Sequence, residues 1–246
     1  MKEIYIGTSG YNYYHWRDDV FYQRGLPQNK YLEFYYTKFN SVELNVTFYR
    51  LPSLKAFEGW AKRTPKTFRF VIKGNRYITH IKRLRDVKEP LKNFKENLTP
   101  LMKKTNCILW QLPPSFKANP EILKNFVHNL EKLKFTKSMR HAFEFRNESW
   151  FTEKIYKILE DNNFCLSVAD LPNTPRAEVL TADFIYIRFH GAKDRYSSNY
   201  SNKELRDMAF KAKEWLSSRK ALYAFFNNDA YGYAPKNAAT FRELVS

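Results

Sequence analysis

The sequence predicts an α/β protein in which a parallel sheet closes into a (β/α)8 barrel. Two observations lead to this prediction: eight short apolar runs recur along the chain, and helical patterns fill most of the gaps between them. Strands that alternate with helices require a parallel sheet, and eight repeats indicate closure. A length of 246 residues fits one such barrel. Because no Gly/Ser-rich or low-complexity linker divides the chain, we expect a single domain over residues 1–246.

The eight apolar runs have the length of strands and are rich in β-branched or aromatic residues. They cover residues 4–7, 42–46, 68–73, 107–112, 141–145, 165–169, 184–189 and 222–226. An open, doubly wound sheet would normally show a Gly-rich first turn. The segment 7–10, GTSG, is too short and wrongly spaced for a dinucleotide-binding turn. The closed barrel is therefore favoured.

Helices are expected where apolar residues recur at spacings of three and four. These segments are 29–39, 53–62, 87–104, 119–133, 151–159, 203–216 and 237–244. Asn119 and Ser201 are suitable N-caps, and Pro90 and Pro120 suit a first helical turn. The gap 171–183 contains two prolines and no helical period, so the sixth crossover is expected to be irregular.

The composition excludes several classes of protein. With 43% hydrophobic and 17% aromatic residues, the chain is not intrinsically disordered. No apolar run reaches the roughly 18 residues of a membrane span, and the first residues lack the apolar stretch of a signal peptide. Cys107 and Cys165 lie in apolar runs and are expected to be buried free thiols. These features predict a soluble, cytoplasmic protein with no membrane partner.

The chain is strongly basic, and the charge is concentrated. It has 42 Lys and Arg against 25 Asp and Glu, a net charge of +17. Residues 62–104 contain fourteen Lys and Arg against three acids. Such a field attracts phosphates or acidic surfaces. A genome-wide compositional bias that leaves only a solvated basic face remains the alternative.

Ordered blocks of sequence along nearly the whole chain resemble the YecE-like family, domain of unknown function 72. The blocks are GTSGYNY (7–13) with Trp16, FNSVELN (39–45) with TFY (47–49), FRF (68–70) with Lys73, ITH (78–80), QLPPSF (111–116), EFR (144–146) with SWF (149–151), YIRFHG (186–191), FNN (226–228), GYA (232–234) and NA (237–238). The resemblance implies a TIM-type barrel whose biochemical activity is not established. Tyr11 stands where the family usually has Trp, so a ligand stacked there could be bound differently.

Polar side chains gather at the carboxyl ends of the predicted strands, where barrel enzymes build their sites. Period-2 alternation turns Glu43, Asn45, Glu144, Arg146, Tyr186, Arg188 and His190 toward the barrel interior. Lys73, Gln111, Asp170 and Asn227 or Asn228 end four further strands, and Asp229 follows. Isolated buried charges are costly, so the group must be either a ligand site or a self-satisfying ion-pair network. We expect a ligand site.

Two enzyme readings of this group stay open. Glu144, Asp170, His190 and Asp229 follow the order of the divalent-metal site of barrel sugar isomerases and would suit Mg²⁺, Mn²⁺ or Zn²⁺, although nearby arginines would repel a cation. Alternatively, Glu43 and Glu144 could be the paired carboxylates of a glycosidase. Apart from a possible divalent metal, no cofactor is predicted.

The leading hypothesis is binding of a phosphate-bearing ligand, above all nucleic acid, at the barrel mouth. In it Lys73, Arg146 and Arg188 hold phosphates, residues 73–85 form a basic rim, and aromatic rings stack on bases. The candidate ligand-binding residues are Lys73, Arg146, Arg188, Asn45, Gln111, Asn227, Asn228, Tyr11, Tyr49 and Arg76. The candidate catalytic residues are Glu43, Glu144, Asp170 and His190, with Glu43 or Glu144 as base and His190 either as acid or as a partner that orients the other groups. Whether the protein also hydrolyses a phosphodiester is left open by the sequence.

Overall fold

Every predicted strand is present in the computed structural model, which describes residues 2–135 and 139–246. All strand pairs are parallel. The sixth run is divided at Ser167 into two short strands. The strands are β1 (Glu3–Thr8), β2 (Ser41–Leu44), β3 (Arg69–Lys73), β4 (Thr105–Gln111), β5 (Arg140–Glu144), β6 (Cys165–Leu166), β7 (Val168–Asp170), β8 (Phe184–Phe189) and β9 (Ala221–Phe226).

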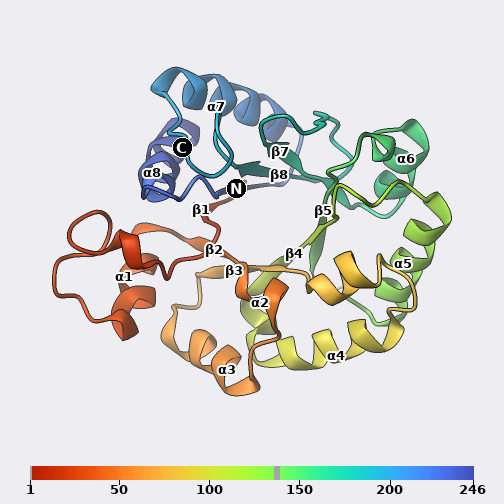
Figure 1. Ribbon diagram of the computed structural model, residues 1–246, viewed down its shortest axis with the longest axis horizontal. Helices are drawn as coiled ribbons and strands as arrows, with labels where there is room; N and C mark the ends of the chain where they lie inside the picture. Colours follow the sequence, from red (N-terminus) through yellow and green to blue (C-terminus); the bar gives the residue numbers. More distant parts are fainter. Residues whose placement is uncertain (1, 136–138) are drawn as a thin grey trace.

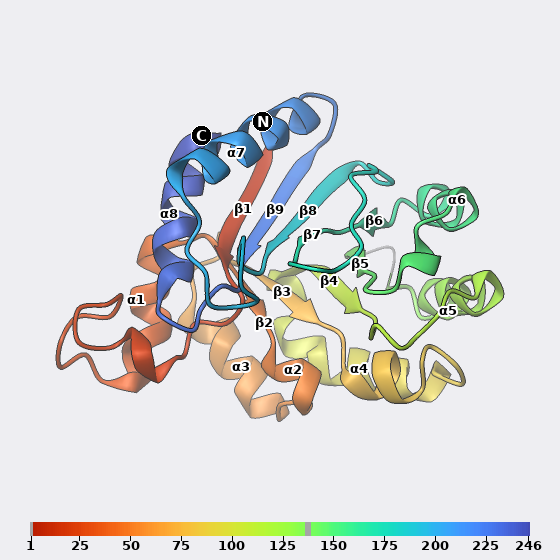
Figure 2. The ribbon, with the colours of Figure 1, turned by 45° about the horizontal axis from the view of Figure 1, so that its top comes forward.

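The strands form two sheets rather than one closed ladder. One sheet has the order β2-β3-β4-β5-β6, and the other has the order β1-β9-β8-β7. Figure 2 shows β1, β9 and β8 running side by side within the second sheet. The closed barrel predicted from the sequence is therefore corrected to two parallel sheets. Side chains explain both interruptions.

At the junction of β1 and β2, Tyr35 supplies the hydrogen bonds that a continuous ladder would make. Its hydroxyl accepts from Thr8 N at 2.9 Å and donates to the Ser41 carbonyl at 3.1 Å. The two strands still approach closely, because a Cβ on Gly7 would lie only 2.0 Å from the Ser41 carbonyl oxygen. The side chain of Asn40 adds bonds to the backbone of residues 4 and 6.

At the other junction, between β6 and the sheet of β8, a threonine satisfies the free backbone groups. Thr181 Oγ1 accepts from Leu166 N at 2.8 Å and donates to the Phe164 carbonyl at 2.7 Å. A buried backbone group needs such a partner, since leaving one unpaired costs about as much as a lost hydrogen bond. The two-residue strand β6 can therefore end without a neighbour from β8.

Helices surround the strands (Figure 1). They are α1 (Tyr31–Lys38), α2 (Val46–Tyr49), α3 (Leu54–Arg63), α4 (Lys88–Leu98), α5 (Pro120–Lys132), α6 (Glu153–Asp161), α7 (Asn202–Ser217) and α8 (Tyr233–Val245). Asn119 caps α5 and Ser201 caps α7 with a capping box, as predicted. The gap 171–183 contains no helix, which confirms the irregular sixth crossover.

Two short helical segments after β2 and β3 were not predicted. The strand predicted over 42–46 ends at Leu44, because Asn45 has helical φ and ψ of −86° and −17° and begins α2. A single π-helical turn, Tyr77–Ile81, follows β3. Both segments lie at the carboxyl ends of their strands, so they shape the side of the protein on which the polar residues were expected.

Side chains alternate between an inner and an outer core. Val71, Leu109, Tyr186 and Phe225 belong to an inner cluster to which strands of both sheets contribute. Their neighbours in the chain pack outward against the helices. Cys107 and Cys165 are buried free thiols, as predicted. Within residues 2–135 and 139–246, no helix is both long and apolar enough to cross a membrane.

The junction bonds give a test of the fold. Removing the Tyr35 hydroxyl in Tyr35→Phe leaves Thr8 N and the Ser41 carbonyl without this partner. We expect the free energy of unfolding to fall by about 1–3 kcal/mol, measured by urea denaturation. Tyr36→Phe on the same helix is the control, since no residue that the structure describes bonds to the Tyr36 hydroxyl. Equal losses in the two variants would contradict this role of Tyr35.

Candidate functional site

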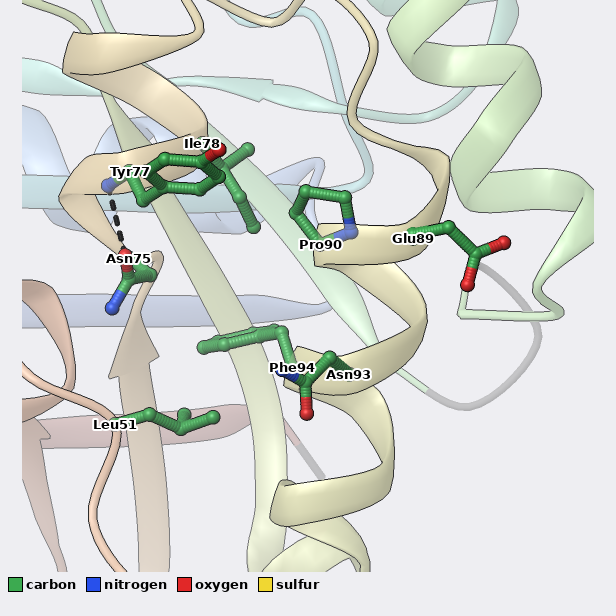
Figure 3. Close-up of a pocket in the computed structure, with 8 residues that line it drawn as sticks. All are labelled: Leu51, Asn75, Tyr77, Ile78, Glu89, Pro90, Asn93 and Phe94. Carbon is green, nitrogen blue, oxygen red and sulfur yellow. Dashed lines mark hydrogen bonds between the residues drawn. The ribbon is translucent and has the colours of Figure 1, made fainter.

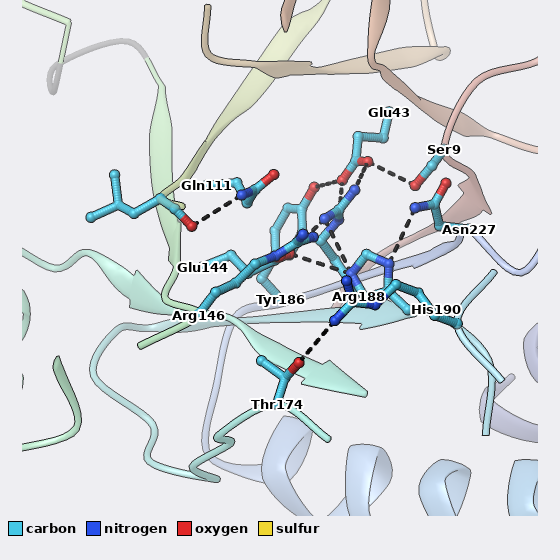
Figure 4. Close-up of polar contacts among 12 residues, drawn as sticks. Ser9, Glu43, Gln111, Glu144, Arg146, Thr174, Tyr186, Arg188, His190 and Asn227 are labelled. Atoms are coloured by element: carbon cyan, nitrogen blue, oxygen red, sulfur yellow. Dashed lines mark hydrogen bonds and ion pairs between the residues drawn. The ribbon is translucent and has the colours of Figure 1, made fainter. Parts of the chain in front are cut away.

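A fully buried arginine organises the polar residues at the carboxyl ends of the strands (Figure 4). Arg188 on β8 donates from Nε and Nη2 to the two carboxylate oxygens of Glu43, at 2.9 and 2.6 Å. Its Nη1 donates to Glu144 Oε2 at 2.5 Å and lies 3.2 Å from His190 Nε2. Arg188, Glu43, Glu144 and His190 are each 0% exposed. We call these four residues the arginine cluster.

The remaining lone pairs of the two carboxylates are also used. Ser9 Oγ and the Tyr186 hydroxyl each donate to Glu43 at 2.7 Å. Arg146 Nε donates to Glu144 Oε1 at 2.7 Å. The alternation of inner and outer side chains turns all of these strand residues to the same interior, as predicted from the sequence. The positions of Glu43, Glu144, Arg188 and His190 thus agree with that prediction.

The electrostatics hold both glutamates in their ionised form. Burial alone would raise the pKa of each, but the Arg188 charge and the hydrogen bonds hold the pKa of Glu43 below its usual range and that of Glu144 well below it. A glycosidase needs one protonated carboxyl group near neutral pH. Neither glutamate meets that requirement, so the arrangement does not favour glycoside hydrolysis.

His190 is a neutral imidazole inside the cluster. Burial, with the nearby Arg188 charge, lowers its pKa to about 4. Its Nδ1 lies 3.1 Å from Asn227 Nδ2, so Asn227 joins the site through this ring. With such a pKa, His190 carries no proton to donate as an imidazolium at neutral pH. This weakens its predicted role as an acid.

Lys73 ends β3 and points into the same interior. It shares the face of Val71, which packs in the inner core. Its side chain is held over the Phe48 ring, with Nζ 4.2 Å from the ring centroid, and the residue is 8% exposed. Burial, followed by the Arg188 charge, lowers its pKa to about 7. Lys73 is therefore only partly charged at neutral pH.

His80, from the π-helical turn, packs on the same phenylalanine. Its ring centroid lies 4.8 Å from that of Phe48, and its Nδ1 lies 2.9 Å from Thr79 Oγ1. Gln111 Nε2 is 3.5 Å from His80 Nε2 and donates to the Leu112 carbonyl. Burial lowers the pKa of His80 to about 4. Gln111 therefore lies beside His80, and both His80 and Lys73 contact the Phe48 ring.

Asp170 and Asp229 do not join the arginine cluster. Asp170 shares the outer face of Val168 and contacts Arg176 at 2.8 Å and the Tyr200 hydroxyl at 2.7 Å. Asp229 accepts from Trp16 Nε1 at 2.5 Å and lies 3.0 Å from His15 Nε2. Of the four residues of the metal hypothesis, Glu144 and His190 thus lie together, whereas Asp170 and Asp229 lie apart from them. In the described part of the chain, no three His, Cys, Asp or Glu side chains gather as a metal site.

Four other residues that were predicted to bind the ligand lie outside the arginine cluster. Asn228 bonds to Asn237 and the Ser198 carbonyl and so fixes α8. The Tyr11 hydroxyl accepts from Trp60 Nε1 at 3.0 Å, and its ring is partly buried against the outer core. Tyr49 is 70% exposed, and Arg76 is also exposed. Of the other predicted residues, Asn45 has a buried carboxamide oxygen to which no residue in the described part of the chain donates a hydrogen bond.

Four residues that contact the site were not among the predicted catalytic or ligand-binding residues: Ser9, Phe48, His80 and Tyr186. Phe48 lies in α2 and contacts both Lys73 and His80; the unpredicted helix hid its direction. Ser9 belongs to the segment GTSG, and its hydroxyl donates to Glu43. The resemblance blocks GTSGYNY, TFY, ITH and YIRFHG contain the four residues and were the available signal.

The predicted basic rim follows β3 and has an unusual backbone. After the π-helical turn, Arg83, Leu84 and Asp86 all have positive φ, between 47° and 65°. Such conformations are costly and cluster at functional sites. Beside this rim lies a cavity of about 520 Å³ (Figure 3). It is lined by Leu51, Asn75, Tyr77, Ile78, Glu89, Pro90, Asn93 and Phe94.

The chain matches one protein family over almost its entire length. The family model described as "Protein of unknown function DUF72" matches residues 5–246. The UPF0759 protein YunF of Bacillus subtilis is 30% identical, with 98% of this chain and 94% of YunF covered. A crystal structure of a DUF72 family protein (TM1631) from Thermotoga maritima is 33% identical, covers 99% of both chains and has a TM-score of 0.84.

A more distant likeness concerns the fold alone. An AP endonuclease of family 2 from Brucella melitensis superposes with a TM-score of 0.52 over 99% of both chains, at 10% identity. At that identity the comparison shows a shared α/β architecture.

The buried ion pairs predict an unusual dependence of stability on pH. In Arg188→Met, Glu43 and Glu144 lose their buried cation, so we expect the free energy of unfolding at pH 7 to fall by about 3–5 kcal/mol. Without the Arg188 cation, burial raises the pKa of Glu43, while Glu144 keeps its ion pair with Arg146, so the variant should regain part of its stability as the pH falls from 7 to 5. In the wild type the folded pKa values are lowered, so this contribution is kept at pH 5 and is lost only below about 4.5.

Urea denaturation at pH 7 and pH 5 measures both effects. Arg206→Met, which removes an exposed arginine of α7, is the control. A loss in Arg188→Met no greater than in the control, or a loss that does not shrink at pH 5, would contradict the assignment.

Proposed function

The chain belongs to the DUF72 family of unknown function, and we propose that it binds a phosphate-bearing ligand, above all nucleic acid, at the carboxyl ends of its strands. The proposal rests on one observation, the distribution of charge at this mouth. Arg188 and Arg146 together balance the charges of the two buried carboxylates, and the basic rim provides further positive charge beside them.

Arg146 is the residue best suited to a phosphate. Only its Nε bonds to Glu144, and no described residue bonds to its two terminal nitrogens. Its side chain is 13% exposed, so these nitrogens lie at the edge of the buried cluster. Arginine forks match phosphate oxygens and keep their charge at any ordinary pH. Arg146 therefore combines permanent charge with free donors.

The other two predicted phosphate ligands take different roles in this proposal. Arg188 makes four contacts inside the cluster, so a phosphate could reach it only by displacing a glutamate. Lys73 is only partly charged at neutral pH because its pKa is about 7. We assign the phosphate contacts to Arg146 and to exposed rim residues such as Arg76.

Nucleic acid is favoured over a small phosphate because of what surrounds the mouth. Tyr49 and Tyr77 expose 70% and 46% of their surface, and exposed aromatic rings stack on unpaired bases. Tyr77 also lines the cavity beside the rim, and Ile78 and Phe94 are further lining residues of this cavity (Figure 3). Fourteen basic residues between positions 62 and 104 would attract further phosphates along a strand.

Fluorescence anisotropy of a labelled single-stranded oligonucleotide tests the proposal. We expect binding that weakens with salt, with a logarithmic slope of roughly −0.7 per phosphate contacted. Arg146→Gln and Arg76→Gln should each weaken binding by roughly tenfold and make the slope shallower by about one contact. Arg76 is exposed, so its variant leaves the core intact.

Arg206→Gln is the matched control, because it removes the same charge from α7. If all three variants bind equally weakly, the +17 charge attracts the strand without a site, and the proposal fails. Absence of binding at low salt would also contradict it.

A further inference from the structure

The side chain of Lys73 is buried, and no described residue pairs with its amine. Within residues 2–135 and 139–246, no side chain or carbonyl accepts a hydrogen bond from its Nζ. Its contact is the face of the Phe48 ring. The backbone beneath it is fixed, because Thr47 Oγ1 donates to the Lys73 carbonyl at 2.7 Å and Gly74 N donates to the Leu109 carbonyl. Buried lysines are normally paired, so this amine needs another explanation.

The nearby acids do not pair with this amine because other groups occupy them. Glu43 accepts from Arg188, Ser9 and Tyr186. Glu144 accepts from Arg188 and Arg146. The groups that act electrostatically on Lys73 are thus two arginines, which disfavour its ammonium form, and two neutralised glutamates, which favour it. Stability does not account for a lysine placed in this way, since a buried ammonium without a partner costs free energy.

The environment is suited to a nucleophilic amine. Burial and the two arginines lower the pKa of Lys73 to about 7, so about half of the molecules carry the neutral amine at pH 7. Desolvation beside another cation is a known way to activate a lysine toward carbonyl groups. The position, at the carboxyl end of a parallel strand, is where α/β enzymes of this architecture place catalytic residues.

We infer that Lys73 Nζ forms an imine with the carbonyl carbon of a phosphate-bearing aldehyde or ketone at this mouth. The phosphate contact, from Arg146, rests on the proposed function; the imine does not. As the neutral amine attacks the carbonyl carbon, a C–N bond forms and one proton passes through solvent from the nitrogen to the carbonyl oxygen, which becomes a hydroxyl. The hydroxyl then leaves as water with the second nitrogen proton, and a C=N bond replaces the C–O bond. No oxidant or reductant is required.

Reductive trapping tests the inference on the unmodified protein. Glycolaldehyde phosphate is added at a substoichiometric amount at pH 7, and cyanoborohydride supplies a hydride to the imine carbon. Peptide mapping by mass spectrometry then locates the label. We expect Lys73 to carry at least about tenfold more label than any exposed lysine, because those remain ammonium ions at this pH. Labelling of Lys73 should rise between pH 6 and pH 8, as its amine loses its proton.

Variants and a second probe separate the two proposals. Lys73→Arg should remove the preferred label, whereas Lys213→Arg, at an exposed position of α7, should leave it unchanged. Glycolaldehyde, which lacks the phosphate, should label Lys73 roughly tenfold less. Equal labelling of Lys73 by both probes would support imine formation but would contradict a contact between the phosphate and Arg146. Label spread evenly over exposed lysines, with none preferred on Lys73, would overturn the imine.

Discussion

The pairing of Arg188 with Glu43 and Glu144 is the constraint on which the rest of this structure depends. Arg188 belongs to the sheet β1-β9-β8-β7, whereas both glutamates belong to the sheet β2-β3-β4-β5-β6. Their ion pairs therefore join two sheets that, in the described part of the chain, are linked by one isolated backbone bridge, from Ser9 to Glu43. Taking any one of these charges out of water alone would cost several kcal/mol, so the three must be assembled together. The sheets are thereby fixed at the end where ligands are expected.

The same pairing determines what the site can do. Because Arg188 and Arg146 hold the carboxylates ionised and hydrogen-bonded, these carboxylates do not supply protons and do not pair with Lys73, and no described residue bonds to the terminal nitrogens of Arg146. The chemistry is thereby left to the cations and to neutral imidazoles. The basic rim would attract an anion, and an electrophilic carbon would find an uncharged amine at Lys73. Both proposals follow from this one distribution of charge.

The sequence predicted the strands and the interior direction of Glu43, Glu144, Arg188 and His190, because period-2 alternation is a local property of a strand. It did not predict which groups pair, since pairing depends on how distant strands are aligned. The same limit explains why two predicted aspartates do not join the arginine cluster. Asp170 lies on the outer face of β7, and Asp229 is hydrogen-bonded to His15 and Trp16. The prediction of a closed barrel was wrong for a similar reason. Side chains such as Tyr35 replace backbone hydrogen bonds between strands, and no periodicity in the sequence reveals this.

The ionisation of Lys73 tests the account most directly, because it depends on burial, on the two arginines and on the absence of a free carboxylate together. NMR of protein labelled with ¹³C at the lysine ε carbons follows each amine through a pH titration, and Lys73→Arg assigns the signal. The account predicts one signal that titrates near pH 7. Titration of every lysine near the ordinary value of about 10.4 would contradict it, because Lys73 would then be a solvated or paired ammonium ion.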